Sequence, residues 1–225
     1  MKNIYWIIIT GSLIFIACSR IPNTNATQSL TEAQQYFLEI ALSSEYGDKS
    51  HVVRKWTTHI YLASYTTLPP YLQRELDLIV DEINSLSSSI KIVRVREIIE
   101  ANVVLFVTDA VTYGNYEPNA IPYLDANLGF FWVHWQNNYT IYKSSVYVNK
   151  TVDSTCQKHL LREEITQMLG LLNDSYRYPE SIFYQGWTCT TTYTAIDKQL
   201  IEYILSPRIH PGMTREQVIS VFQNW

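Results

Sequence analysis

One segment in the C-terminal half, residues 156–175, constrains the fold of this chain more than any other. It reads CQKHLLREEITQMLGLLNDS and predicts a helix that runs to Leu169 and stops at Gly170. Residues three or four positions apart align on one helix face, because such steps nearly complete whole turns. One face is apolar and must be covered by other elements: Leu161, Ile165, Met168 and Leu172. Another face is mostly polar: His159, Glu163, Gln167 and Gly170.

The elements around this helix predict what it packs on. Alternating or apolar runs predict strands at residues 51–63, 90–95, 102–108, 128–136 and 141–149. Helical spacing with capping residues predicts helices at residues 29–45, 69–89, 154–169, 190–205 and 214–222. Residues 109–127 are expected to be irregular. The order predicts an α+β (α/β-like) single domain at residues 30–225, with a mixed sheet of about five strands and a helical C-terminal tail.

The N-terminal residues predict export. A start with one lysine precedes an apolar stretch over residues 4–17, which is typical of a signal peptide and short for a membrane span. Phe15-Ile16-Ala17-Cys18 resembles a bacterial lipobox, in which Cys18 is lipidated and becomes the new N-terminus. The alternative is a plain signal peptide with an incidental cysteine. We therefore expect a signal peptide at 1–17, a lipidated cysteine with a flexible tether at 18–29, and an envelope location, at the outer rather than the inner membrane.

The cysteine count agrees with this location. The chain has three cysteines, so lipidation of Cys18 leaves an even pair, Cys156 and Cys189. An oxidising compartment permits disulfides. We predict a Cys156–Cys189 bridge.

Charge and glycine spacing exclude two classes of partner. There are 17 basic and 21 acidic side chains, and Lys and Arg form no run longer than a pair, which argues against nucleic acid. The seven glycines do not fall at the spacing of a phosphate-binding loop, so no nucleotide is expected. The expected partners are a membrane, through the N-terminal lipid, and a peptide or an envelope protein.

The helix and the turn after it resemble a known motif. Residues 163–174, EEITQMLGLLND, are similar to the metzincin zinc-peptidase motif H-E-x-x-H-x-x-G-x-x-H-D. The resemblance places the general base on Glu164, the glycine on Gly170 and the trailing aspartate on Asp174. Phe183, in the segment SIFY, stands where those enzymes have the methionine of a turn under the metal. The three zinc-binding histidine positions hold other residues: Glu163, Gln167 and Asn173.

A second resemblance covers more of the chain. The segments REEITQMLGLLNDS, YPESIF and SPRIHPGM resemble the uncharacterised secreted domain-of-unknown-function 2927 family, across roughly residues 30–215. That family implies no activity. The metzincin likeness implies a zincin fold whose motif helix follows the last strand.

The substitutions decide the expected chemistry. Zinc peptidases need three imidazole or anionic ligands and an open position for water. Gln167 and Asn173 offer neutral amide oxygens, which suit Ca²⁺ or Mg²⁺ better than zinc. His159, one turn before Glu163, could complete a different site.

Three hypotheses follow from this donor set. The first is a zincin-like fold without zinc or another cofactor, serving as a non-catalytic binding or structural protein. The second is a metal-dependent, peptidase-like hydrolase with atypical ligands, in which Glu164 is the catalytic base. The third is a structural calcium site built from Glu163, Asn173, Asp174 and backbone carbonyls.

The segment LGFFWVHWQ at residues 128–136 also has two interpretations. It is apolar on both faces, which favours a strand covered on both sides. Its place in the order is also where zincins present the strand that pairs with an extended substrate.

Overall fold

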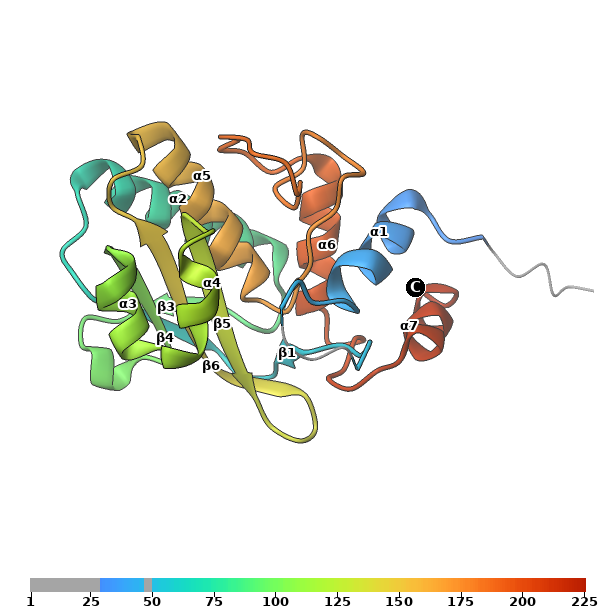
Figure 1. Ribbon diagram of the computed structural model, residues 1–225. Coiled ribbons are helices and arrows are strands. Elements are labelled where there is room, and N and C mark those ends of the chain that lie inside the picture. The colour runs from blue at the N-terminus through green and yellow to red at the C-terminus, as the bar shows by residue number, and fades with distance from the viewer. Residues whose placement is uncertain (1–28, 47–49) are drawn as a thin grey trace, which may run out of the picture.

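The computed structural model describes residues 29–46 and 50–225 (Figure 1). The predicted signal peptide, Cys18 and nearly all of the tether lie outside the described residues. In chain order the elements are α1 (Glu32–Ala41), β1 (Lys55–Trp56), β2 (Ile60–Ser64), α2 (Pro70–Leu86), β3 (Ile92–Arg94), a 3₁₀ turn (Ile98–Glu100), β4 (Val103–Thr108), α3 (Ala110–Tyr116), a 3₁₀ turn (Pro118–Ala120), α4 (Ile121–Leu124), β5 (Gly129–Trp135), β6 (Thr140–Asn149), α5 (Ser154–Gln167), α6 (Ala195–Leu205) and α7 (Arg215–Phe222).

The described strands form one mixed sheet of six. Strands β3, β2, β4 and β6 lie side by side in that order and run parallel, and the short β1 pairs with the start of β6. Strand β5 pairs antiparallel with β6, from Gly129 opposite Val148 to Trp135 opposite Ile141. The mixed sheet and the motif helix after its last strand are as predicted, with one strand more than the five expected.

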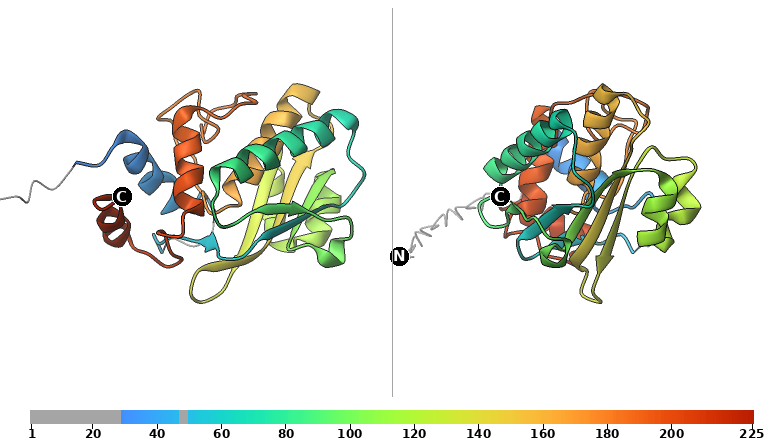
Figure 2. Two further views of the ribbon diagram at one scale, coloured as in Figure 1. Left: turned by 180° about the vertical axis from the view of Figure 1, so that it is seen from behind. Right: turned by 90° about the vertical axis from the view of Figure 1, so that its left-hand side faces the viewer.

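Helices cover both faces of the sheet (Figure 2). Helices α2 and α5 pack on one face and contact each other, while α3 and α4 lie on the other. Helices α1, α6 and α7 pack together beside the sheet (Figure 1). None of the helices within residues 29–46 and 50–225 is long and apolar enough to cross a membrane.

Strand β4 shows why both faces need cover. Its side chains alternate between two apolar cores, as the pleat of a strand requires. Val103 and Leu105 belong to the large core under α2 and α5, whereas Val104 and Phe106 belong to the smaller core with α3 and α4. A strand that is apolar at every position is therefore buried on both sides.

The predicted strand at residues 51–63 is two strands in different parts of the sheet. Lys55–Trp56 pairs with β6, and Ile60–Ser64 pairs with β3 and β4. The break follows from a long-range contact, because the buried Trp56 donates its indole N–H to the carbonyl of Met168, 2.9 Å away. This contact fixes β1 against the end of α5.

The segment at residues 109–127 is helical rather than irregular. Asp109 caps α3 by accepting from the backbone N–H of Thr112. Tyr113 then stacks on Tyr147 of the sheet, with ring centroids 5.1 Å apart, and its hydroxyl lies 2.9 Å from the Ser145 hydroxyl. The short helices form because this face of the sheet must be covered.

Several helix ends differ from the prediction, because other side chains supply the caps. Thr31 and Gln34 form the capping box of α1, which ends at Ala41. Thr194 and Asp197 form that of α6, five residues later than expected. Helix α5 is capped by Asp153, and it ends at Gln167, two residues before the predicted end. Helix α7 has a capping box of Thr214 with Gln217.

Candidate functional site

The end of α5 is fixed by a glycine that no other residue could replace without strain. Gly170 has φ +120°, and a Cβ built on it would lie 2.0 Å from the backbone oxygen of Arg54. Side chains other than glycine rarely adopt this conformation. The chain therefore turns sharply after the helix and brings residues 173 and 174 back toward it.

A cleft of about 290 Å³ lies along α5, at the start of β5. Its second wall comes from the segment before α6. The residues that line it are Glu45, Tyr46, Ala126, Asn127, Leu128, Gly129, Phe130, Phe131, His159, Leu160, Glu163, Glu164, Gln167, Asp174, Tyr184, Gln185, Gly186, Trp187 and Thr188.

The cleft brings together most of the residues singled out from the sequence, but not Asn173. His159, Glu163, Glu164 and Gln167 all line it. The Asn173 amide is instead directed to backbone carbonyls, those of Asp174 at 2.8 Å and Glu39 at 3.4 Å. Asp174, the next residue, faces the cleft in its place.

The polar side chains of α5 are largely engaged with one another or with the backbone. His159 lies with Nδ1 2.8 Å from the Thr190 carbonyl oxygen and Nε2 3.2 Å from a Glu163 carboxylate oxygen. Burial lowers the pKa of His159, but the hydrogen bond and charge of Glu163 outweigh it and raise that pKa above its ordinary value. Gln167 donates its amide N–H to the Asp174 carboxylate. Because of these contacts, few ligand atoms of α5 are free to coordinate a metal ion.

Glu164 is the most secluded carboxyl group of the cleft. Its side chain packs against Gly129, where an added Cβ would lie 2.5 Å from Glu164 Oε1. Burial, together with the charges of Glu163, Asp174 and Glu45, raises the pKa of Glu164 well above its ordinary value. Burial and the charges of Glu163 and Glu45 likewise raise the pKa of Asp174.

Phe183 lies fully buried in the turn that follows the motif. The turn is held by a short parallel bridge, in which the Ser175 N–H donates to the Phe183 carbonyl at 3.0 Å. Asp197, also fully buried, accepts from the Ser181 hydroxyl at 2.6 Å and from the Ile182 N–H at 3.2 Å. Asp197 was not predicted from the sequence, although its capping-box spacing from Thr194 marks it.

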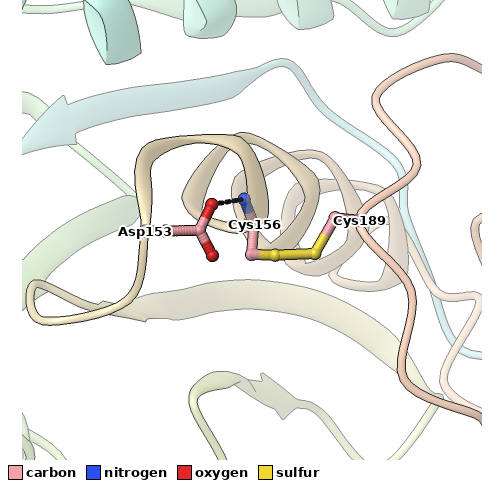
Figure 3. A group of neighbouring side chains, drawn as sticks. All are labelled: Asp153, Cys156 and Cys189. Atoms are coloured by element: carbon pink, nitrogen blue, oxygen red, sulfur yellow. Dashed lines mark hydrogen bonds between the residues drawn. A yellow bond between two sulfur atoms is a disulfide. The ribbon is translucent and has the colours of Figure 1, made fainter.

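The predicted Cys156–Cys189 disulfide is confirmed, with its Cα atoms 4.6 Å apart (Figure 3). It joins the first turn of α5 to the segment that forms the second cleft wall. Asp153 lies beside it and accepts from the Cys156 N–H at 3.2 Å. In the described part of the chain, these three residues are the group of His, Cys, Asp or Glu side chains close enough to share a metal ion. The disulfide removes both thiolates, so this group lacks the donors a metal needs.

The cleft residues do not fit a zinc ion. Among the described residues, no three His, Cys, Asp or Glu ligand atoms of the cleft lie within 4.8 Å of one another. Two of the three motif positions are engaged in hydrogen bonds. The Gln167 amide donates to the Asp174 carboxylate, and the Asn173 amide donates to the Asp174 backbone carbonyl. Neutral amides are also poor zinc donors.

An aromatic rim completes the cleft and was not predicted. Tyr46 comes from the segment after α1, and its ring lies 5.5 Å from that of Phe130 on β5. Tyr184 and Trp187 come from the opposite wall, and Trp187 is 62% exposed. No local pattern marks these residues, because only the tertiary fold brings them to one cavity.

The fold resembles solved structures, and the sequence matches one family model. No curated protein matches the sequence. The crystal structure of myroilysin is similar at 11% identity with a TM-score of 0.45, covering 80% of this chain and 97% of that one. The family model described as "Protein of unknown function (DUF2927)" matches residues 31–224. The chain belongs to the DUF2927 family.

Proposed function

We propose that this protein is a lipid-anchored component of the bacterial envelope whose zincin-like domain binds a polypeptide ligand in its cleft without cleaving it. The observation that carries the proposal is that the motif side chains are engaged in contacts within the protein. Gln167 is bonded to Asp174, Asn173 faces the backbone, and Glu163 is paired with His159. The positions that would hold a catalytic metal instead stabilise the cleft wall.

Strand β5 supports a polypeptide as the ligand. It is the antiparallel edge of the described sheet and pairs on one side with β6, and its first residues line the cleft. An extended segment can add to such an edge through main-chain hydrogen bonds. The cleft would then receive one of its side chains.

Metal content tests the proposal directly. The full chain is purified in mild detergent without chelator or affinity metal and analysed by elemental mass spectrometry, beside Glu163→Ala and the exposed control Glu202→Ala. We expect no stoichiometric metal, and no change in melting on addition of zinc or calcium. About one equivalent of zinc, lost in Glu163→Ala but kept in Glu202→Ala, would overturn the proposal. One equivalent of calcium with the same pattern would support the structural calcium site instead.

A second candidate is a hydrolase in which Glu164 transfers the proton. The observation that favours it is a buried carboxyl group at a cleft with a strongly raised pKa, which is typical of catalytic acids and bases. A peptide-library digest with wild type and Glu164→Gln decides between the two. Turnover that Glu164→Gln abolishes would support the hydrolase, and no turnover by either protein supports the binding role.

A further inference from the structure

We infer that the cleft binds the guanidinium group of an arginine side chain presented by an extended polypeptide, an inference that rests on the binding role proposed above. It names the chemistry of the ligand, and four features of the cleft carry it.

The first feature is the charge of the cleft. Four of its lining residues are acidic and none of the described lining residues is a lysine or arginine. One histidine, His159, lies beside Glu163, with Nε2 3.2 Å from its carboxylate oxygen and Nδ1 2.8 Å from the Thr190 carbonyl oxygen. Glu45, Glu164 and Asp174 have no such neighbour within the described cleft. A ligand of positive charge is therefore complementary to it.

The second feature is Glu164 itself. Its side chain lines the cavity, is only 6% exposed, and makes no hydrogen bond to any described residue. A buried carboxyl group without a partner is costly, and its partner is expected to come from outside. The contact with Gly129 leaves its cavity side as the direction from which a donor can approach.

The third feature is the spread of the acceptors. A calcium ion needs its oxygen ligands to converge at about 2.3–2.6 Å, and a magnesium ion at about 2.0–2.1 Å. Among the described residues, no three carboxylate or imidazole ligand atoms of this cleft lie within 4.8 Å of one another. A guanidinium group carries five N–H donors in a planar fork, so it can reach separated carboxylates that a bare ion cannot join.

The fourth feature is the aromatic rim. Trp187 is 62% exposed at the mouth of the cleft, and Tyr46 and Tyr184 line it from opposite walls. Aromatic faces attract cations, and a planar guanidinium also stacks on them. An exposed tryptophan at an acidic cavity thus suits an arginine better than an ammonium group, which is a point charge.

The test is calorimetric titration of the full chain in mild detergent with blocked tripeptides. The probes are acetyl-Ala-Arg-Ala-amide, the same peptide with citrulline, which has the shape of arginine without its charge, and the same peptide with lysine. Argininamide alone separates capture of the cation from capture of the peptide backbone. We expect the arginine peptide to bind at least about tenfold more tightly than the citrulline peptide, as is usual for hydrogen bonds to charged groups. It should also bind more tightly than argininamide.

Variants locate the binding in this cleft. Glu164→Gln, which removes the charge of the unpartnered carboxyl group, should weaken the arginine peptide about tenfold or more. Trp187→Ala, which removes an exposed side chain and leaves the core intact, should weaken it about two- to fivefold. Glu202→Gln, an exposed acid on α6, should leave binding unchanged. Thermal melting of each variant confirms that it is folded.

Each outcome bears on a different proposal. Equal binding of arginine and citrulline peptides, or binding of neither, would overturn the inference. If, in that case, the protein holds no metal and cleaves no peptide, the proposed binding role remains, but arginine is not its ligand. Equal binding of the lysine peptide would overturn the guanidinium assignment. Stoichiometric zinc with peptide turnover would overturn the proposed function itself.

Discussion

Gly170 controls where the residues after α5 are placed. Its φ of +120° and the 2.0 Å approach of a Cβ to the Arg54 backbone oxygen leave no room for a side chain. We expect Gly170→Ala to destabilise the fold by about 3 kcal/mol or more, since both backbone strain and overpacking oppose it. Urea unfolding measures this, and Gly186→Ala, whose nearest contact is the movable ring of Tyr184, is the control. Equal stability of Gly170→Ala and wild type would contradict the structure.

Replacing Glu164 by glutamine should stabilise the fold by an amount that depends on pH. Because its folded pKa is raised, the folded state binds more protons than the unfolded state, and stability falls as pH rises above the ordinary glutamate pKa of about 4.3. Glu164→Gln removes this penalty, so it should gain little at pH 4 and most at pH 7 and above. A gain of about 1 kcal/mol would raise Tm by about 2–4 °C. If the difference in Tm between Glu164→Gln and wild type does not change with pH, ionisation of the buried Glu164 carboxyl group does not destabilise the fold.

The site was predictable from sequence only along the helix. His159, Glu163 and Gln167 share a face by spacing alone, and the structure brings them to one cleft. Asn173 was expected at the site, but its amide donates to the backbone carbonyl of Asp174. The turn at Gly170 places the Asp174 carboxylate in the cleft, where it accepts from the Gln167 amide. Contributions from distant segments, such as Glu45 and Trp187, have no local signal at all.

A buried arginine on α5, Arg162, forms ion pairs with two glutamates of α2. Arg162 is 3% exposed and contacts Glu75 Oε1 at 2.8 Å, the more exposed Glu82, and the ring of Tyr193 at 4.6 Å. Arg162→Met leaves the buried Glu75 without its partner, and we expect a loss of about 3–5 kcal/mol.

The same arginine offers its own control. Glu82→Gln removes the partner whose side chain is 38% exposed, and should cost under about 1 kcal/mol. Urea unfolding of both variants makes the comparison. Similar losses would mean that burial does not separate the two ion pairs.

At the scale of elements, periodicity predicted most helices and strands, but not the elements whose form depends on a partner. Lys55–Trp56 is separated from Ile60–Ser64 because Trp56 bonds to the end of α5. Helix α3 forms because Tyr113 has a sheet face to cover. Neither partner lies near in sequence, so no local window contains the cause.

For the whole molecule, the mixed sheet and its motif helix followed from the order of elements, whereas the pairing of β5 with β6 at one edge did not. Strand order depends on which apolar faces meet, and alternation within a strand does not specify its neighbour.

Membrane attachment is the prediction that concerns the chain as a whole. We expect the wild-type protein to fractionate with membranes and to incorporate labelled fatty acid. Cys18→Ser should take up no label, because the thiol that would carry the lipid is gone. Label in the Cys18→Ser variant would rule out the lipobox, and an unlabelled wild type would favour a plain signal peptide.

The disulfide also turns part of the chain into a covalent ring. Cys156 and Cys189 are 33 positions apart, and the loop they close contains most of α5, the turn at Gly170 and much of the second cleft wall. A protease that cuts the exposed chain near Tyr176 would therefore open the ring without releasing either piece. Such nicked molecules should migrate as one species on a non-reducing gel and as two on a reducing gel, so damage to this wall stays hidden until the sulfurs are reduced.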